Sequence, residues 1–145
     1  MNPENSLVIT TINPPNEVLM TYTRECAARN IRFIVVGDKK SPVDFSLEGC
    51  DFMAIEHQLE LGFGLASMLP MNHYARKNLG YLQAIRLGSK VIIETDDDNF
   101  PKSGFFDLKP VRRIVNTFCG EGWMNVYRYF SNEFLWPRGY PLQLI

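Results

Sequence analysis

The sequence predicts an α/β fold of three layers, in which helices cover both faces of a mostly parallel sheet. Three short apolar segments rich in β-branched residues are typical of buried strands, and they lie at residues 7–12, 31–36 and 91–95. The first two are separated by a segment of helical periodicity. A strand–helix–strand unit of this kind gives parallel neighbours with a right-handed crossover. The length of 145 residues suits one domain, which we expect to span residues 1–145.

Capping residues and apolar spacing predict two helices. The first begins after Asn16 and has its apolar positions at Val18, Leu19, Tyr22 and Cys26. The second begins after Asn72 and ends before Gly88, with an apolar stripe at Leu79, Leu82 and Ile85. Residues 51–55 favour a short strand, and residues 111–118 favour a strand or a short helix. Gly62 and Gly64 weaken any helix in residues 56–69, which stays undecided.

Composition excludes several classes of function. Fifteen basic against sixteen acidic residues leave a net charge of −1, which gives no reason to expect nucleic-acid binding. No apolar run reaches the roughly 18 residues that a membrane span needs, so we expect no membrane segment in this chain. The three cysteines lack zinc or disulfide spacing, which fits a reducing compartment. We therefore expect a cytoplasmic protein, or the Golgi lumen for a part of a membrane-anchored homologue.

The main candidate site is a run of three aspartates directly after the third predicted strand. On an extended segment Asp96 and Asp98 point the same way, so their carboxylates can share a face. Carboxylate oxygens suit Mn²⁺ or Mg²⁺, which also bind phosphate oxygens. Ligands of open α/β sheets bind beyond the carboxyl ends of the strands, where this run lies. We expect Asp96 and Asp98 to hold a divalent metal and Asp97 to contact substrate; the alternative is a solvated acidic turn.

Basic residues precede this strand in the second predicted helix. Arg76 and Lys77 oppose the helix dipole in its first turns, so they gain nothing locally. We expect them to bind diphosphate oxygens; the alternative is an exposed basic face. Gly80 shares the face of Arg76 and costs helix stability, which suggests close approach of the helix to the sheet or a ligand.

Polar residues also follow the first two predicted strands. Asp38, with Lys39 beside it, can accept hydrogen bonds from a pyrimidine N–H or a ribose hydroxyl. A loop aspartate in an Asx turn is the alternative. Thr10, Thr11 and Asn13 occupy the matching end of the first strand and are candidates to line a base pocket.

A rigid turn near the end of the chain presents Arg138 between two prolines, Pro137 and Pro141. The alternative is a packed loop in which Arg138 pairs with a surface carboxylate. His57 and His73 have no visible partner, and we interpret both as structural or surface residues.

These pieces together resemble the STELLO-type family of glycosyltransferase-like proteins. The resemblance rests on YARKNLGYLQAIRLGSKVIIETDDDN at residues 74–99, IVVGDKKSP at 34–42 and NVYRYFSNEFLWPRGYPL at 125–142. A more distant resemblance is to the reversibly glycosylated polypeptides, which include UDP-arabinopyranose mutases. It rests on two short runs, at Ala75, Arg76, Gly80 and Tyr81 and at Arg138, Gly139, Tyr140 and Pro141.

Both resemblances imply a GT-A-like, Rossmann-like half that binds a nucleotide-diphosphate sugar, with UDP as the nucleotide. They imply metal linkage for Asp96 and Asp98, a base contact for Asp38 and a phosphate contact for Arg76. The second implies that Arg138 is catalytic, because the matching arginine of that family carries sugar reversibly. The acceptor half is expected to be absent from this chain, and no general base is identified.

Three functions follow as hypotheses. The first is a metal-dependent glycosyltransferase, or its nucleotide-sugar-binding domain, with an unknown acceptor. The second is a UDP-sugar mutase or self-glycosylating protein that acts through Arg138. The third is a non-catalytic nucleotide-sugar-binding or scaffold domain, which the short chain favours.

Overall fold

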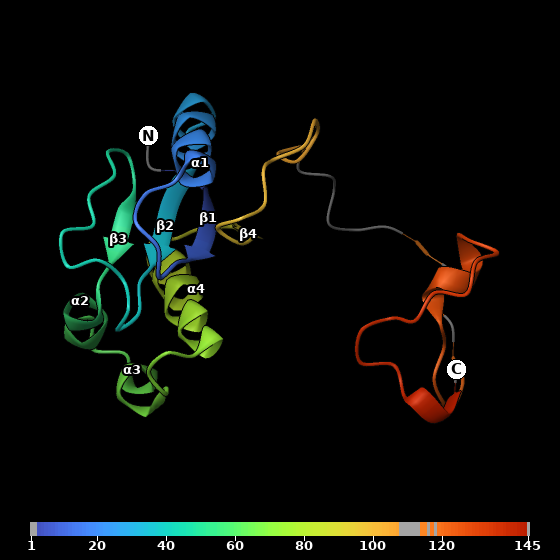
Figure 1. Ribbon diagram of the computed structural model, residues 1–145. Helices are drawn as coiled ribbons and strands as arrows, with labels where there is room; N and C mark the ends of the chain where they lie inside the picture. The colour runs from blue at the N-terminus through green and yellow to red at the C-terminus, as the bar shows by residue number, and fades with distance from the viewer. Residues whose placement is uncertain (1–2, 108–113, 116, 118, 145) are drawn as a thin grey trace. The chain divides into compact units, whose positions relative to one another are not determined.

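The computed structural model describes residues 3–107, 114, 115, 117 and 119–144 (Figure 1). They form two compact units, Met1–Phe106 and Asp107–Ile145, which are described separately below. The expectation of a single domain stays a prediction. Most of the segment predicted as a strand or short helix, at residues 111–118, lies outside the described residues.

The first unit is built on a parallel sheet of four strands in the order β3-β2-β1-β4. The strands are β1 Asn5–Thr10, β2 Arg32–Val36, β3 Asp51–Met53 and β4 Val91–Glu94. Val8 of β1 lies opposite Ile34 of β2 and Glu94 of β4, and every pairing is parallel. The predicted α/β fold with a parallel sheet is confirmed. All four strands therefore end at the same edge of the sheet.

Helix α1, Glu17–Ala28, covers one face of the sheet. The side chain of Asn16 accepts a hydrogen bond from the Leu19 N–H at 2.9 Å and caps the helix, as predicted. The four predicted apolar positions are all buried, and they pack with Leu7, Ile9, Phe33 and Val35 of β1 and β2. This face is the larger of the two buried clusters.

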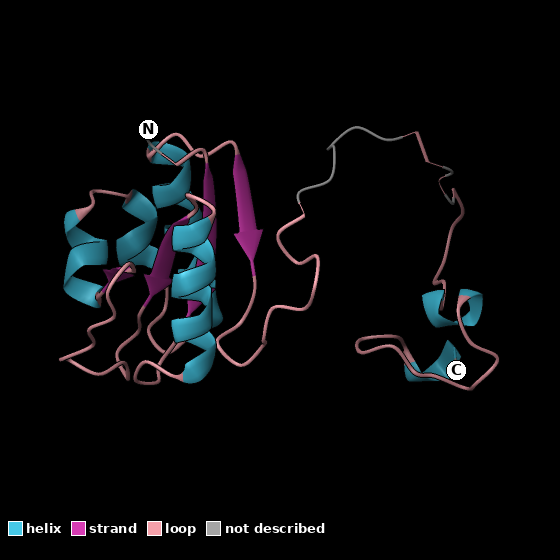
Figure 2. Cartoon of the chain, turned by 90° about the horizontal axis from the view of Figure 1, so that it is seen from above, coloured by secondary structure: helices cyan, strands magenta, loops and turns pink. Residues whose placement is uncertain are grey.

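Helix α4, Lys77–Arg86, covers the opposite face after a short 3₁₀ turn, η1, Tyr74–Arg76 (Figure 2). The sequence predicts Asn72 as the cap of this helix, but the prediction is wrong. Asn72 has a φ of 52°, and the His73 side chain caps the turn instead. Leu79 is fully buried, but Ile85 is 60% exposed. Steps of three residues fall short of a helical turn, so the predicted stripe drifts off the buried face.

Two short helices fill the segment that the sequence leaves undecided. They are α2 Ile55–Glu60 and α3 Gly64–Met68, and they flank the α4 side of the sheet. Gly62 separates them with a φ of 73°, a conformation that glycine adopts without strain. The glycines therefore end and begin helices here, where one continuous helix would be weakened.

Helix α4 approaches the sheet closely at Gly80, as the sequence predicts. A Cβ atom on this residue would lie 2.5 Å from Val8 Cγ1 and 2.7 Å from Val36 Cγ2. Both valines belong to the buried cluster on this face. The missing side chain thus sets how near the first turn of α4 lies to the strand ends.

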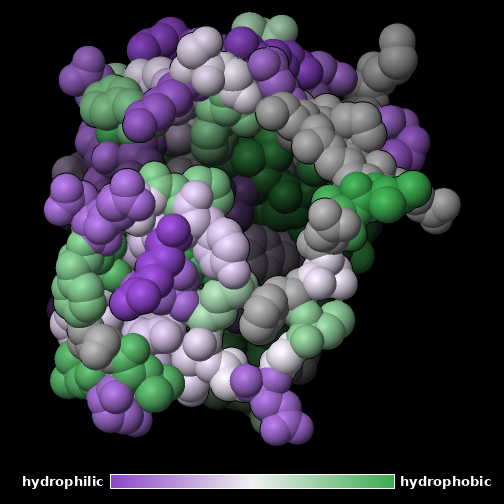
Figure 3. All heavy atoms as spheres, turned by 90° about the vertical axis from the view of Figure 1, so that its right-hand side faces the viewer, coloured by the Kyte–Doolittle hydropathy of each residue, from purple (hydrophilic) through white to green (hydrophobic). Residues whose placement is uncertain are grey.

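The second unit contains two short 3₁₀ turns, η2 Val126–Tyr129 and η3 Leu142–Leu144. The Trp136 indole donates to the Tyr140 carbonyl at 2.9 Å and closes the turn that carries Arg138. Gly139 has a φ of 82° in this turn, and Arg138 is exposed. The two turns bury no residue. The face in Figure 3 shows hydrophobic residues at the surface of the molecule. No helix in the described part of the chain is both long and apolar enough to cross a membrane.

Replacing Gly80 with alanine is expected to destabilise the fold. The added Cβ forces apart a packed helix and sheet, which costs about 1–3 kcal/mol and exceeds the gain of about 1 kcal/mol in helix propensity. Urea unfolding should show a lower midpoint. The control is Gly64→Ala, where an added Cβ meets nothing within 4 Å. An unchanged midpoint for Gly80→Ala would contradict the close approach.

Candidate functional site

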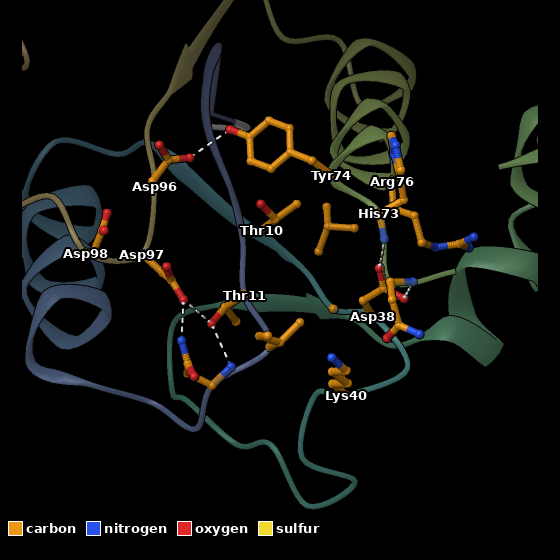
Figure 4. A pocket seen from close by; sticks show the side chains of 15 residues that line it. Thr10, Thr11, Asp38, Lys40, His73, Tyr74, Arg76, Asp96, Asp97 and Asp98 are labelled. Atoms are coloured by element: carbon orange, nitrogen blue, oxygen red, sulfur yellow. Dashed lines mark hydrogen bonds between the residues drawn. The ribbon is translucent and has the colours of Figure 1, made fainter. Parts of the chain in front are cut away.

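A cleft of about 460 Å³ opens at the carboxyl ends of the strands. Its wall includes eight of the residues predicted for the site: Thr10, Thr11, Asn13, Asp38, Arg76, Asp96, Asp97 and Asp98. The three aspartates lie at one end and Asp38 at the other, with Thr10 and Thr11 between them (Figure 4). Lys39 and Lys77 are not among the lining residues, and Arg138 belongs to the second unit.

The aspartate run forms a turn instead of continuing the strand. The Asn99 N–H donates to the Asp96 carbonyl at 3.4 Å, and β4 ends at Glu94. The alternation expected for an extended segment therefore does not apply to Asp96 and Asp98. Their assignment as metal ligands stays a prediction.

Asp97 joins the acidic turn to the loop between β1 and α1. Its carboxylate accepts hydrogen bonds from the Thr11 hydroxyl and from Asn13 Nδ2, the latter at 3.0 Å. Asn16 Nδ2 donates to the Asp97 carbonyl at 2.9 Å. Thr11 and Asn13, predicted as substrate-binding residues, thus hold Asp97 and shape the wall of the cleft.

Lys77 is the counter-ion of the acidic end of the cleft. Its side chain is 2% exposed, and Nζ lies 2.8 Å from Glu94 Oε1 and 3.1 Å from Asp96 Oδ1. The same ammonium donates to the Thr95 carbonyl at 2.8 Å and to the Tyr74 hydroxyl. Four acceptors surround the Lys77 ammonium, which offsets part of the negative charge of the turn. The predicted direct contact with diphosphate stays untested.

These contacts shift the titration of the groups involved. Burial alone would lower the pKa of Lys77, but hydrogen bonds with Glu94, Tyr74 and Asp96 outweigh it and raise that pKa. The hydrogen bond from Lys77 lowers the pKa of Glu94. Hydrogen bonds from Tyr74 and Lys77 lower the pKa of Asp96. The lysine and both carboxylates are therefore charged at neutral pH.

The acidic turn offers few ligands for a metal. Among the described residues no group of three His, Cys, Asp or Glu side chains is arranged to hold an ion. Asp96 has one oxygen, Oδ1, occupied by Lys77 and Tyr74, and no hydrogen bond from a described residue reaches the Asp98 carboxylate. Mg²⁺ in nucleotide sites is commonly held by one or two carboxylates together with phosphate oxygens and water. The donor set fits a cation that is shared with a diphosphate.

Asp38 shapes the opposite end of the cleft. Its Oδ1 accepts from the Asn72 N–H at 2.8 Å and from the Lys39 N–H at 2.7 Å, and its Oδ2 accepts from the His73 N–H at 3.0 Å. Burial alone would raise the pKa of Asp38, but these backbone donors and the charge of Arg76 lower it overall. Asp38 is therefore an ionised acceptor, and Oδ2 retains capacity for a further donor.

Arg76 is buried, with 1% of its surface exposed. Its Nε donates to Gln58 Oε1 at 2.8 Å and its Nη1 to the Leu69 carbonyl at 3.2 Å. The remaining nitrogen, Nη2, is buried with no hydrogen-bond partner among the described residues. These contacts tie η1 to α2 and to the end of α3. The phosphate contact predicted for Arg76 remains to be tested.

Sequence reasoning misses several residues of the site, among them Lys40, Asn72 and His73, which line the cleft, and the three discussed next. Tyr74 lines the cleft and donates to Asp96 at 2.7 Å, Glu94 accepts from Lys77, and Gln58 is a buried partner of Arg76. Tyr74 lies three residues before Lys77, a helical spacing that could have linked the two. Gln58 falls in the undecided segment, where no pattern marks it.

The chain resembles known proteins along nearly its whole length. No protein-family model matches it. It is 29% and 27% identical to two proteins of Arabidopsis thaliana, named Probable glycosyltransferase STELLO1 and Probable glycosyltransferase STELLO2. Each alignment covers 97% of this chain and 20% of the relative, so the chain spans about a fifth of the length of these curated relatives. The predicted resemblance to the STELLO-type family is confirmed.

Replacing Lys77 with methionine is expected to reduce stability by about 1–2 kcal/mol at neutral pH. This is less than the loss for a fully buried pair, because Glu94 and Asp96 are 51% and 48% exposed. Because folding lowers the pKa values of Glu94 and Asp96, the two carboxylates stabilise the fold when the pH is above their ordinary pKa values of 4.5 and 3.8. This stability is lost as the pH falls through the lowered pKa values of the folded state.

Urea unfolding between about pH 7 and pH 3 tests this expectation, since the Lys77→Met variant should lose less stability on acidification than the wild type. The matched control is Lys90→Met, which removes an exposed lysine that lies 2.7 Å from Glu4. Parallel curves for the wild type and Lys77→Met would show that the ion pairs do not stabilise the fold.

Proposed function

We propose that this chain is the nucleotide-sugar-binding part of a metal-dependent glycosyltransferase that uses a UDP-linked sugar. The observation that carries the proposal is the cleft at the strand ends, with the acidic turn at one end and Asp38 at the other. Ligands of open α/β sheets bind at this edge. The names of the two similar proteins agree with this activity.

The two ends of the cleft suit the two ends of a nucleotide-diphosphate sugar. Asp38 is an ionised acceptor and suits a base N–H or a ribose hydroxyl, with Lys39 beside it. The acidic turn suits the diphosphate with its cation. Under this proposal Thr11 and Asn13 line the path between them, and Asp97 contacts the substrate at the acidic end. Arg76 would stabilise the phosphates through its charge.

The charge of the acidic end supports a bound cation. Four acidic residues, Glu94, Asp96, Asp97 and Asp98, lie at this end, and Lys77 forms ion pairs with two of them, Glu94 and Asp96. A diphosphate carries further negative charge, so its approach is unfavourable unless a cation compensates. We propose that Asp96 and Asp98 hold Mn²⁺ or Mg²⁺ there. When bound, the ion would supply electrostatic stabilisation of the departing nucleoside diphosphate.

The acceptor and the turnover belong to the proposal as well. The chain spans only about a fifth of the similar proteins, and no residue of the cleft is assigned as a general base. A domain that binds the nucleotide sugar without turning it over has the same cleft. Transfer or hydrolysis of a nucleotide sugar by the isolated chain distinguishes the two.

The free thiols of Cys26, Cys50 and Cys119 support a reducing, cytoplasmic setting.

Asp96→Asn and Asp98→Asn are each expected to weaken binding of UDP in the presence of Mn²⁺ by about tenfold or more. Each change removes one charged oxygen ligand, and a charge-assisted contact is worth about 1.5–3 kcal/mol. Isothermal titration calorimetry with and without Mn²⁺ measures the effect. The control is Asp44→Asn, an exposed aspartate that does not line the cleft.

If the wild type binds UDP equally well with and without Mn²⁺, the proposed metal site is contradicted, but the proposed nucleotide site is not. Wild-type binding of no nucleotide sugar at all would contradict the proposed function. Unchanged affinity in both aspartate variants would remove the acidic turn from the site.

A second candidate function is self-glycosylation at Arg138. The observation that favours it is the exposed guanidinium, presented by a turn that Gly139 and the Trp136–Tyr140 hydrogen bond hold. An Arg138 nitrogen would bond to the anomeric carbon of the sugar while the bond from that carbon to the diphosphate oxygen breaks. The nucleoside diphosphate would leave with the electron pair, and the nitrogen would lose a proton.

Incubation with UDP-sugars is then expected to add the mass of one sugar residue to the protein, measured by intact mass spectrometry. Arg138→Lys should abolish the gain, because the guanidinium nitrogen is lost. Arg128→Lys, which changes another exposed arginine of the same unit, should keep it. No gain for the wild type with any UDP-sugar would rule out this second function.

A further inference from the structure

Gln58 is a fully buried amide beneath the Asp38 end of the cleft. Its Nε2 donates to the Gly37 carbonyl at 2.8 Å and to the Met53 carbonyl at 2.7 Å. Its Oε1 accepts from Arg76 Nε at 2.8 Å. Both N–H donors and the carbonyl oxygen of this side chain are thus engaged, and the residue has no exposed surface. Gln58 comes from α2 and does not itself line the cleft.

The three partners of Gln58 come from three different elements. Gly37 follows β2, Met53 ends β3, and Arg76 ends η1. The Gly37 N–H also donates to the Met53 carbonyl at 3.0 Å, so Gly37 is held through both of its peptide groups. A Cβ at Gly37 would lie 2.6 Å from Phe52 Cζ, so the backbone is packed against this ring. The Gln58 amide therefore acts together with the Met53 carbonyl and the Phe52 ring to fix where β2 leaves the sheet.

The constraint on Gly37 passes directly to Asp38. The Asp38 N–H donates to Ser41 Oγ at 2.8 Å, and its carboxylate accepts from the backbone of Asn72 and His73. Arg76, the third partner of Gln58, ends the 3₁₀ turn that follows these two residues. Gln58 therefore holds both the residue before Asp38 and the turn that orients its carboxylate.

An amide is the side chain that this position requires. A glutamate would place an acceptor against two carbonyl oxygens, and a methionine would leave both carbonyls and the Arg76 Nε–H without this partner. The acidic end of the cleft has separate supports, in Lys77, Thr11 and Asn13. Loss of Gln58 should therefore affect one end of the cleft and spare the other.

We propose that Gln58 is a positioning residue that sets discrimination between nucleotide bases through Asp38. This inference rests on the proposed function. UDP and CDP share the diphosphate and the ribose, but uracil has an N3–H donor where cytosine has an acceptor. An ionised carboxylate held in place accepts from the first and repels the second. The Asp38 end thus selects a base with a ring N–H donor, and it does so only while Gln58 fixes the loop.

The test is calorimetry of the full chain with UDP and CDP in the presence of Mn²⁺. The wild type is expected to bind UDP at least about tenfold more tightly than CDP. This is the difference in affinity that one hydrogen bond to a charged group contributes. Gln58→Met should reduce this ratio to about twofold or less and leave binding of Mn²⁺ with pyrophosphate unchanged. The control is Gln83→Met, a nearly buried glutamine of α4 that does not line the cleft, which should keep the wild-type ratio.

The ratio of the UDP and CDP affinities separates a positioning role from a general loss of structure, because partial unfolding weakens the binding of both nucleotides equally. If Gln58→Met keeps the wild-type ratio of UDP affinity to CDP affinity, the role of Gln58 is overturned. It is also overturned if Gln83→Met lowers this ratio as much as Gln58→Met does. Equal binding of UDP and CDP by the wild type overturns it as well. If the wild type binds neither nucleotide, the proposed function itself fails.

A measurement on the wild type keeps the test decisive if Gln58→Met does not fold. The side-chain amide resonances of Gln58 are expected to shift in nuclear magnetic resonance spectra on addition of UDP with Mg²⁺, a diamagnetic ion, and to stay in place on addition of pyrophosphate with Mg²⁺. Shifts of the same size with both ligands, or with neither, contradict the coupling of Gln58 to the base end.

Discussion

The parallel pairing of β1 with β4 is the interaction on which the cleft depends. It sets Val8 opposite Glu94, so the loop that follows β1 and the turn that follows β4 leave the sheet side by side. Thr11 and Asn13 can then hydrogen-bond to Asp97, although more than 80 residues separate them in the chain. A shift of one residue in this register would turn the β4 side chains to the other face.

The junction between η1 and α4 supports both ends of the cleft. Arg76 and Lys77 are adjacent, and neighbouring helical residues point in directions about 100° apart. Arg76 therefore reaches Gln58 under the Asp38 end, and Lys77 reaches Glu94 and Asp96 at the acidic end. Gly80 lets this part of the helix lie close to the strands, and the side chains of Arg76 and Lys77 are both buried there.

Sequence reasoning succeeds where one local rule decides the outcome. The β-branched runs became strands, and the Asn16 cap with its apolar spacing became α1. It fails where distant partners decide. Nothing in the spacing of Lys77 and Glu94 marks them as a pair, and a buried lysine in a first helical turn opposes the usual dipole preference. The Asp96 turn replaced an extended segment because its side chains found partners in Tyr74, Thr11 and Asn13.

The hydrogen bonds of Asp97 also bear on how the molecule folds. They join residues 84 and 86 positions apart, so the chain must close a long loop before either bond forms. The strand–helix–strand unit of β1, α1 and β2 involves much shorter separations, and contacts of that kind form faster. The cleft is therefore a late product of folding, and a nascent chain acquires it only after β4 has emerged and docked beside β1.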